Sequence, residues 1–161
     1  MDILNKVHYL LFNYLINFPK TNKKYSVIFD IDETLLYNTK NINKYFPEIK
    51  QITDILKLCN NLNFKIIIIT ARPYMSKQWT IENLKIFNLP YDKLYFNNDF
   101  PNTDFKIQLQ KQLSKTHNII LSIGDQWNDI IGLKNCLCIK LPSETDSNSY
   151  FTFNNHNYYN I

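Results

Sequence analysis

The sequence predicts an α/β fold in which helices cover both faces of one doubly wound, parallel, five-stranded sheet. Apolar runs alternate with amphipathic segments five times along the chain. The runs are apolar at successive positions, as expected for strands that are buried on both faces. The chain has 161 residues, 45% hydrophobic and 15% aromatic, which is enough to bury one core and excludes a disordered chain. We therefore predict a single domain over residues 1–161.

Short runs rich in β-branched residues mark the predicted strands, and amphipathic segments mark the helices between them. The strands are expected at 25–31, 64–70, 92–96, 118–123 and 136–141. The helices are expected at 47–63, 76–89 and 104–117, with a short helical turn at 125–133. Residues 144–161 show no clear period, and we predict a tail whose aromatic side chains pack partly on the body.

The first 19 residues are apolar enough to raise the question of a signal peptide or a membrane anchor. Asp2 precedes every basic residue, Asn13 and Asn17 interrupt the apolar run, and no small-residue cleavage site follows. The run is also shorter than the ~20 apolar residues of a membrane span. Its apolar residues recur at helical spacing, so we predict an amphipathic helix at 1–19 that packs on the domain, in preference to one on a membrane surface.

The cysteines favour a cytoplasmic protein. They are three in number, and Cys136 and Cys138 stand too close in the chain for a usual disulfide. We expect them to be core thiols in a reducing compartment. With no export signal or membrane span recognised, the sequence predicts a cytoplasmic location and no membrane partner.

Polar side chains stand at the ends of three predicted strands. They are Asp30 and Asp32 after the first strand, Thr70 and Arg72 after the second, and Gly124 and Asp125 after the fourth. Ligands of doubly wound sheets bind beyond the carboxyl ends of the strands, near the point where the strand order reverses. The sequence therefore predicts one polar site on this rim.

Carboxyl groups dominate this predicted site. Alternation along an extended segment points Asp30 and Asp32 to the same side, where they repel each other unless a cation or a shared proton relieves them. Asp125 arrives from another strand, and Asp129 follows about one helical turn later. Oxygen ligands of this kind suit Mg²⁺, which completes its shell with water and substrate phosphate.

The motifs that carry these residues resemble those of the haloacid dehalogenase (HAD) superfamily. They are "DIDET" from Asp30, "IIIITAR" ending at Arg72, Lys106, and "SIGDQWNDI" around Asp125. Within the superfamily the chain resembles the branch of class B acid phosphatases and plant vegetative storage proteins, in which Glu, here Glu33, stands where most relatives have Gly. The likeness covers Ser26 to about Ser143 and implies one phosphatase domain with its catalytic core at 25–143.

The resemblance implies a role for each site residue. Asp30 would be the nucleophile that forms an aspartyl-phosphate, and Asp32 would be the general acid and base. Thr70 would donate a hydrogen bond to the transferring phosphoryl group, and Lys106 would neutralise the nucleophile and the phosphate. Arg72 would contact phosphate or substrate, although a structural ion pair is the alternative.

The same resemblance implies a Mg²⁺ site formed by Asp30, Asp32, Asp125 and Asp129. Asp32 would contribute its backbone carbonyl, and Asp129 would hold either a metal-bound water or the lysine. Lys111 and Lys115 are the alternatives to Lys106, because the chain is rich in lysine. Glu33 is a functional acid or a turn residue, and Gln126 and Trp127 are expected to serve packing and the rim of the site.

Members of the superfamily usually select substrates with a cap domain inserted after the first motif or between the second motif and the lysine, and we predict that this chain has none. The segments from Asp32 to Thr70 and from Thr70 to Lys106 are filled by the predicted helices, strands and loops, which leaves no room for a cap. A capless site is open and could accept a bulky substrate. The sequence thus leaves the size of the substrate undecided.

The charge pattern gives limited information about the substrate. The net charge of +4 suits a phosphorylated ligand but is modest. We expect Lys40 and Lys44 on the rim of the site and Lys20, Lys23 and Lys24 at the opposite edge. Because the charge is split between two faces, the sequence does not predict a nucleic-acid track.

The leading hypothesis is a Mg²⁺-dependent phosphomonoesterase of the acid phosphatase or nucleotidase kind, acting on a nucleotide or another small phosphorylated molecule. A polynucleotide-end phosphatase is the alternative enzyme, because "TARP" and "LPYDKLYF" also resemble the phosphatase half of polynucleotide kinase-phosphatases. Two hypotheses of another class are a phosphate- or Mg²⁺-binding protein without turnover and a receiver domain. The intact Asp30 argues against the former, and the position of the acidic pair against the latter.

Overall fold

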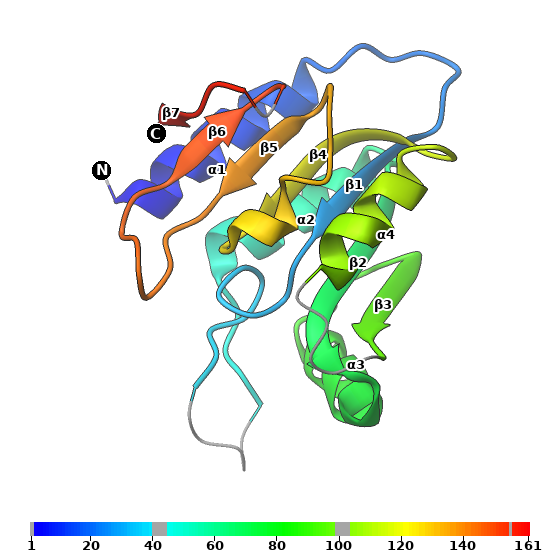
Figure 1. Cartoon of the computed structure of the whole chain (residues 1–161), viewed down its shortest axis with the longest axis vertical. Coiled ribbons are helices and arrows are strands. Elements are labelled where there is room, and N and C mark those ends of the chain that lie inside the picture. Colours follow the sequence, from blue (N-terminus) through cyan, green and yellow to red (C-terminus); the bar gives the residue numbers. More distant parts are fainter. Residues whose placement is uncertain (1, 40–44, 99–103, 155) are drawn as a thin grey trace.

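A computed structural model describes residues 2–39, 45–98, 104–154 and 156–161. Seven strands form one sheet in the order β3-β2-β1-β4-β5-β6-β7 (Figure 1). The strands are β1 Tyr25–Phe29, β2 Lys65–Pro73, β3 Lys93–Asn97, β4 Asn118–Gly124, β5 Leu137–Lys140, β6 Tyr150–Thr152 and β7 Tyr159–Asn160. The first five are parallel, as predicted, while β6 and β7 run antiparallel at one edge. The predicted five-stranded sheet is thus extended by two short strands from the tail.

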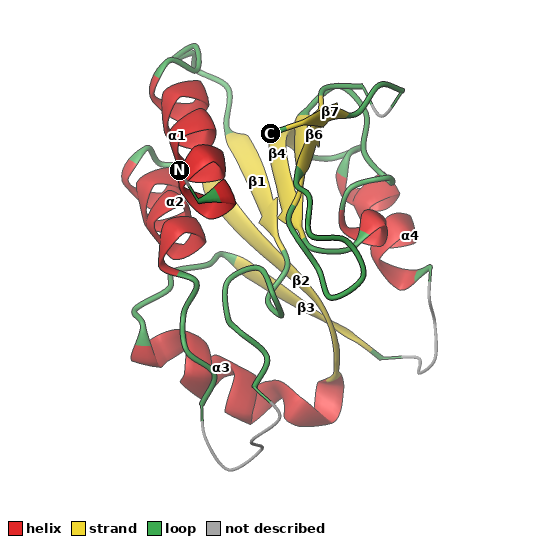
Figure 2. Ribbon diagram, turned by 90° about the vertical axis from the view of Figure 1, so that its left-hand side faces the viewer, coloured by secondary structure: helices red, strands yellow, loops and turns green. Residues whose placement is uncertain are grey.

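Helices cover both faces of this sheet. The helices are α1 Ile3–Ile16, α2 Lys50–Asn61, α3 Lys77–Ile86 and α4 Phe105–Leu113, with 3₁₀ turns η1 Tyr74–Ser76 and η2 Trp127–Asp129. Figure 2 shows α1 and α2 on one face and α4 on the other. The predicted helical turn at 125–133 is the shorter η2. The arrangement is the doubly wound one that the sequence predicts.

Alternation along the central strands divides the core into two layers. In β1, Val27 and Phe29 pack in the cluster on the side of α1 and α2, while Ile28 packs with residues of the α4 side. In β2, Ile66 and Ile67 are divided in the same way. Each such fully buried side chain contributes about 1.5–3 kcal/mol of hydrophobic stabilisation. Both faces of the strands are therefore apolar because both are covered.

The N-terminal helix packs on the body of the domain, as expected. Val7, Leu11 and Leu15 form its buried face, and α1 packs against α2. The hydroxyl of Tyr14 donates a hydrogen bond to the backbone oxygen of Ile120 at 2.9 Å. None of the helices in the described ranges is long and apolar enough to cross a membrane.

The strand order reverses between β1 and β4, and this places the site. From β1 the chain proceeds to β2 and β3 on one side, and from β4 to β5 on the other. Asp30 follows β1 and Asp125 follows β4, so both lie at the carboxyl edge of neighbouring strands. Among the described residues, the chain between β1 and α2 forms loops and holds no extra domain. The predicted rim residues Lys40 and Lys44 lie outside the described residues.

Candidate active site

Asp30 is the most enclosed carboxyl group at the end of β1. It is 5% exposed, and its backbone N–H donates to the oxygen of Ile123 in β4 at 3.0 Å. Its Oδ1 accepts a hydrogen bond from Nζ of Lys106 at 2.5 Å, and its Oδ2 accepts one from Oγ1 of Thr34 at 3.3 Å. The side chain of Asp30 is thus held by α4 and by the turn after β1, while its backbone is held by β4.

Lys106 joins two of the acidic residues. It stands in the first turn of α4, it is 5% exposed, and its Nζ donates to Oδ1 of both Asp30 and Asp129. Lys111 and Lys115, the alternatives from the sequence, are exposed. The structure therefore brings Lys106 and neither of the other two to the acidic residues.

Three buried carboxyl groups form a candidate metal centre. One oxygen each from Asp30, Asp125 and Asp129 lies within 4.8 Å of the others. Oδ2 of Asp129 accepts the backbone N–H of Gln126 at 2.9 Å, and the Gln126 side chain donates to Oδ2 of Asp125 at 2.6 Å. Gly124 has a steric role here, because a Cβ at that position would overlap the Cβ of Asp129.

Burial changes the ionisation of this cluster. Burial is the main reason why the pKa of Asp30 is raised to about 7, and the attraction of Lys106 acts in the opposite direction. Burial is also the main reason why the pKa of Asp125 is raised to about 6. Burial also raises the pKa of Asp129. For Lys106 burial is the largest single effect and lowers the pKa, but the combined attraction of Asp30 and Asp129 raises it above its usual range. The cluster holds more negative charge than one lysine neutralises, which favours a bound cation.

Asp32 is paired with Arg72 outside this cluster. Nε and Nη2 of Arg72 donate to the two carboxylate oxygens of Asp32 at 2.9 and 2.7 Å. Nη1 of Arg72 donates to Thr80, and its guanidinium lies 4.8 Å from the ring centre of Trp79 and 5.3 Å from that of Phe46. Asp32 lines the same cavity as Asp30, but its side chain bonds to Arg72 and is not one of the three clustered carboxyl groups. The metal contact predicted for Asp32 is through its backbone carbonyl, and it stays a prediction. The ion pair that was the alternative for Arg72 is present.

A turn explains this placement of Asp32. The strand β1 ends at Phe29, and the backbone N–H groups of Thr34, Leu35 and Leu36 all donate to the oxygen of Ile31. Simple strand alternation therefore stops before Asp32. Glu33 lies within the turn at a φ of 55°, a left-handed conformation that glycine adopts more readily than other residues.

Thr70 stands near the end of β2, two residues before Arg72. It is fully buried in β2, and its Oγ1 accepts the backbone N–H of Arg72 at 3.2 Å. The cavity is lined at this point by Ala71 instead. The structure thus connects Thr70 with Arg72 and does not bring its side chain to the acidic cluster.

Two hollows adjoin at this edge of the sheet. The acidic one has a volume of about 420 Å³ and contains Asp30, Lys106 and Asp125 in its wall. The other, of about 340 Å³, is lined by Phe46, Arg72 and Trp79, among others. Asp32 and Asn38 line both. A phosphate group could therefore enter the first while a flat apolar group occupies the second.

Sequence reasoning missed several supporting residues. Thr34 contacts Asp30 and belongs to the quoted "DIDET" motif, which was a usable signal. Gln110 stands one helical turn after Lys106 and connects α4 to the segment after β4, where it bonds the oxygen of Asn128 at 3.0 Å and the N–H of Gly132 at 2.9 Å. No motif pointed to Gln110. Trp127 packs on Tyr150 and Tyr158, which agrees with its expected packing role.

Comparison with protein families identifies the chain. A family model described as HAD superfamily, subfamily IIIB (acid phosphatase), matches residues 41–161, which is more than half of the chain. This chain belongs to the subfamily IIIB acid phosphatases of the HAD superfamily. The family is the one that the motifs of the sequence resemble. The matched region of the phosphatase begins after Asp30 and Asp32, so their importance depends on the motif and on the geometry above.

Solved structures share the fold of this acid phosphatase. The class C acid phosphatase from Bacillus anthracis has a TM-score of 0.62 at 22% identity, covering 81% of this chain and 64% of that one. A structure titled as the Pnkp1/Rnl/Hen1 complex also has a TM-score of 0.62, at 17% identity, covering 76% of this chain and 47% of that one. The chain thus spans less than two thirds of the length of either of these proteins. Among curated proteins we find no match.

Proposed function

We propose that this acid phosphatase is a Mg²⁺-dependent phosphomonoesterase that works through an aspartyl-phosphate on Asp30. The observation that carries the proposal is the pairing of a buried Asp30 with Lys106 beside two further buried carboxyl groups. A carboxylate in this position can act as a nucleophile if nearby positive charge stabilises it and it stays unprotonated. Lys106 supplies part of that balance.

The donor set fits a hard divalent cation. All candidate donors are oxygens, which suits Mg²⁺ better than a thiophilic metal. Asp30 and Asp125 would bind it with their side chains and Asp32 with its backbone carbonyl. Both oxygens of Asp129 already accept hydrogen bonds, from Lys106 and from Gln126, which favours an indirect role that orients the lysine. When bound, the ion would neutralise carboxylate repulsion and the charge of the substrate phosphate.

The protein groups can be assigned to a two-step transfer. In the first step Asp32 is in its protonated form, an oxygen of Asp30 attacks phosphorus, the bond from phosphorus to the ester oxygen breaks, and Asp32 gives that oxygen its proton and becomes a carboxylate. In the second step Asp32 takes a proton from water, the water oxygen bonds to phosphorus, and the phosphoryl group leaves Asp30 as phosphate. Lys106 balances charge on Asp30 and the phosphoryl oxygens throughout.

Arg72 and Thr70 would act around this chemistry. We propose that Arg72 holds the carboxylate of Asp32 at the edge of the cavity through its two hydrogen bonds. Arg72 would contact the substrate while it remains bonded to Asp32. Thr70 would support Arg72 through the backbone, and reach the phosphoryl group only if the segment around Ala71 shifts.

The hollow beside Arg72 favours a substrate with a flat leaving group. Its wall offers the aromatic rings of Phe46 and Trp79, and Phe46 is fixed to α3 by two backbone hydrogen bonds with Asn83, both at 3.0 Å. The Arg72 guanidinium lies against both rings, so a nucleobase or another flat group would pack on this combined apolar and cationic wall. We therefore propose nucleotides and aryl phosphates as the preferred small substrates.

A polynucleotide-end phosphatase is the second candidate. Two observations favour it, the open site and the similarity of fold to the protein titled as part of the Pnkp1/Rnl/Hen1 RNA repair complex. In this case the terminal nucleotide would occupy the same two hollows, and the remaining strand would lie outside them.

A substrate panel separates these candidates. Turnover of p-nitrophenyl phosphate, nucleotides, and 3′- and 5′-phosphorylated oligonucleotides would be measured with Mg²⁺ and with EDTA. We expect activity that requires Mg²⁺ and is lost in Asp30→Asn but kept in Asp54→Asn, a carboxyl change on the surface of α2. Unchanged turnover in Asp30→Asn would refute the mechanism, and no turnover of any substrate by the wild type would favour a binding protein.

A further inference from the structure

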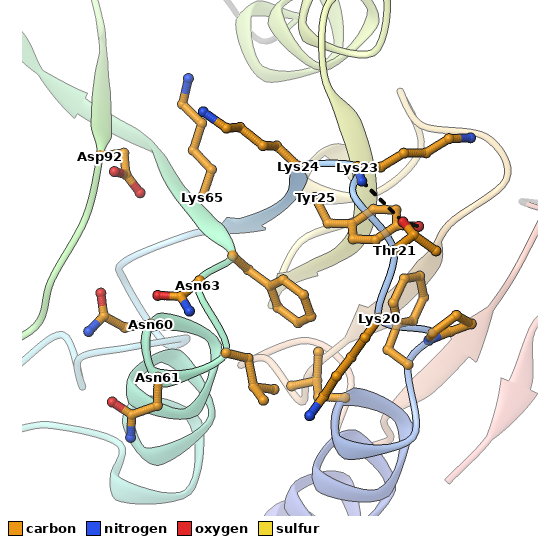
Figure 3. Close-up of a pocket in the computed structure, with 15 residues that line it drawn as sticks. Lys20, Thr21, Lys23, Lys24, Tyr25, Asn60, Asn61, Asn63, Lys65 and Asp92 are labelled. Atoms are coloured by element: carbon orange, nitrogen blue, oxygen red, sulfur yellow. Dashed lines mark hydrogen bonds between the residues drawn. The ribbon is translucent and has the colours of Figure 1, made fainter.

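A basic groove lies at the edge of the sheet opposite the acidic cavity (Figure 3). It has a volume of about 890 Å³ and is formed where β1 and β2 begin and where α1 and α2 end. Lys20, Lys23, Lys24 and Lys65 line it, with Asp92 as the single carboxyl group among the lining residues. Lys20, Lys23 and Lys24, which were predicted to lie at this edge, thus share a concave surface with Lys65.

The lysines have few partners inside the protein. Lys20, Lys23 and Lys24 are exposed and form no ion pair within the ranges that the structure describes. Lys65 contacts Nε2 of His117 at 3.2 Å, which leaves its charge uncompensated. The carboxylate of Asp92 accepts the backbone N–H of Ile66 at 2.7 Å. The groove therefore carries an excess of positive charge that the fold does not neutralise.

The lysines of the groove are not explained by stabilisation of the two helix ends beside them. The carboxyl ends of α1 and α2 point towards the groove, and cations near such ends are favourable. However, neither helix has a basic residue in its last turn, and the dipole effect falls off within that turn. The lysines instead belong to the segment before β1 and to the start of β2.

Aromatic rings that pack on one another line the groove, and neutral polar groups border it. Phe18 packs edge to face on Tyr25 at 4.9 Å and on Phe64 at 6.2 Å. Asn60 and Asn63 add amide groups, which both donate and accept hydrogen bonds. A ligand would therefore find fixed apolar and amide surfaces between separated ammonium groups.

We propose that this groove binds the phosphodiester backbone of single-stranded nucleic acid. In Figure 3, Lys20 and Lys24 reach different parts of the rim. Dispersed cations suit a chain of successive phosphates, whereas one phosphate needs donors that converge. A membrane surface is the poorer match, because a concave basic surface cannot insert apolar side chains into lipid. The inference does not depend on the phosphatase mechanism, since the groove and the acidic cavity lie at opposite edges.

Fluorescence anisotropy with a labelled oligonucleotide of about 20 nucleotides, longer than typical single-strand sites, tests the inference. The oligonucleotide would carry no terminal phosphate, and EDTA would be present, so that the phosphatase site contributes nothing. For K20Q/K23Q/K24Q we expect a roughly tenfold or greater loss of affinity and a decrease of about 2 in the slope of log K against log salt concentration. The charge-matched control K6Q/K85Q/K111Q, exposed lysines outside the groove, should retain both values.

Several outcomes would overturn the proposal. They are no binding by the wild type, an equal loss in both triple variants, or equally tight lysine-dependent binding of tripolyphosphate, polyglutamate or phosphatidylserine vesicles. Circular dichroism would verify that each variant is folded. Asp30→Asn should bind the oligonucleotide like the wild type, which separates a failure of this inference from a failure of the proposed catalytic mechanism.

Discussion

The acidic cavity and the basic groove lie at opposite edges of the sheet. They differ in the sign of their charge, in burial, and in whether their charged groups form ion pairs. Among the residues that the structure describes, five carboxyl groups and one lysine line the acidic cavity, whereas four lysines and one carboxyl group line the basic groove. The single strand β1 connects them, because Tyr25 at its start lines the groove and Asp30 after its end lines the cavity. Buried, mutually bonded charges interact strongly, whereas exposed charges are screened and act collectively. Single substitutions should therefore be severe in the cavity and mild in the groove.

Lys106→Met should have the largest effect, because it leaves the buried carboxyl groups of Asp30 and Asp129 without their common partner. The free energy of unfolding should fall by about 3–5 kcal/mol, and kcat for p-nitrophenyl phosphate by about 10³-fold. Denaturant titration and steady-state kinetics would measure the two changes. Lys111→Met on the exposed side of α4 is the matched control, and equal losses in both variants would contradict the special role of Lys106.

Gly124→Ala should come next, because its new Cβ would overlap the side chain of Asp129. We expect a loss of stability of about 2 kcal/mol and a clear loss of Mg²⁺ affinity, as overpacking displaces Asp129. Thermal unfolding and Mg²⁺ titration would measure them. Adding Asp129→Gly, which removes the overlapped Cβ, should recover part of the stability but not the activity; if it recovers no stability, the overlap is not the cause.

The stability of the metal-free protein should depend on pH through Asp30 and Asp125. Their pKa values rise from 3.8 to about 7 and about 6 on folding, so their contribution to stability is present at low pH and lost as pH rises through this range. With EDTA, stability should fall by about 1–3 kcal/mol between pH 4 and pH 8, and Mg²⁺ should restore it. Thermal unfolding across this range would measure the effect. Asp30→Asn should flatten the curve, and an unchanged curve would contradict the assignment.

Arg72→Lys should have a smaller effect than these changes. Lysine cannot form the paired hydrogen bonds that hold Asp32, so we expect kcat to fall by about tenfold and the pH profile of kcat to change shape. Thr80→Val, which removes only the third hydrogen bond of Arg72, should cause a weaker change of the same kind. A loss confined to KM would indicate that Arg72 acts on substrate binding instead.

Single changes in the basic groove should have the smallest effect. Lys23→Gln should alter the free energy of unfolding by about 0.5 kcal/mol or less, and should leave turnover of small phosphate esters unchanged. Thermal unfolding and kinetics at two salt concentrations would measure this. A change in kcat comparable with that of Arg72→Lys would mean that the two edges of the sheet are coupled.

The features best predicted from the sequence are those for which burial or the chemistry of the site allows few residue types. The five parallel strands followed from apolar runs, and Asp30, Asp125 and Lys106 followed from motifs whose spacing the fold brings together. The strands β6 and β7 could not be predicted, because two or three residues are too few to show a period and they form by pairing along the edge of β5.

Side-chain orientation near the site was harder to predict. The rule of strand alternation does not extend to Asp32, because the strand ends at Phe29 and a turn around Ile31 follows. The choice between substrate contact and an ion pair for Arg72 depended on a partner 40 residues away in the chain. Similarly, the basic groove could not be predicted, because Lys65 joins the lysines before β1 only through the pairing of β1 with β2.

Trapping the covalent intermediate tests the central claim most directly. The wild type would be mixed with p-nitrophenyl phosphate and Mg²⁺, quenched in acid during the first turnover, and reduced with borohydride, which converts an aspartyl-phosphate to homoserine. We expect mass spectrometry to find homoserine at position 30, dependent on substrate and absent from Asp30→Asn. Homoserine at Asp32 or Asp125, or turnover without any trapped residue, would contradict the assignment of Asp30 as the nucleophile.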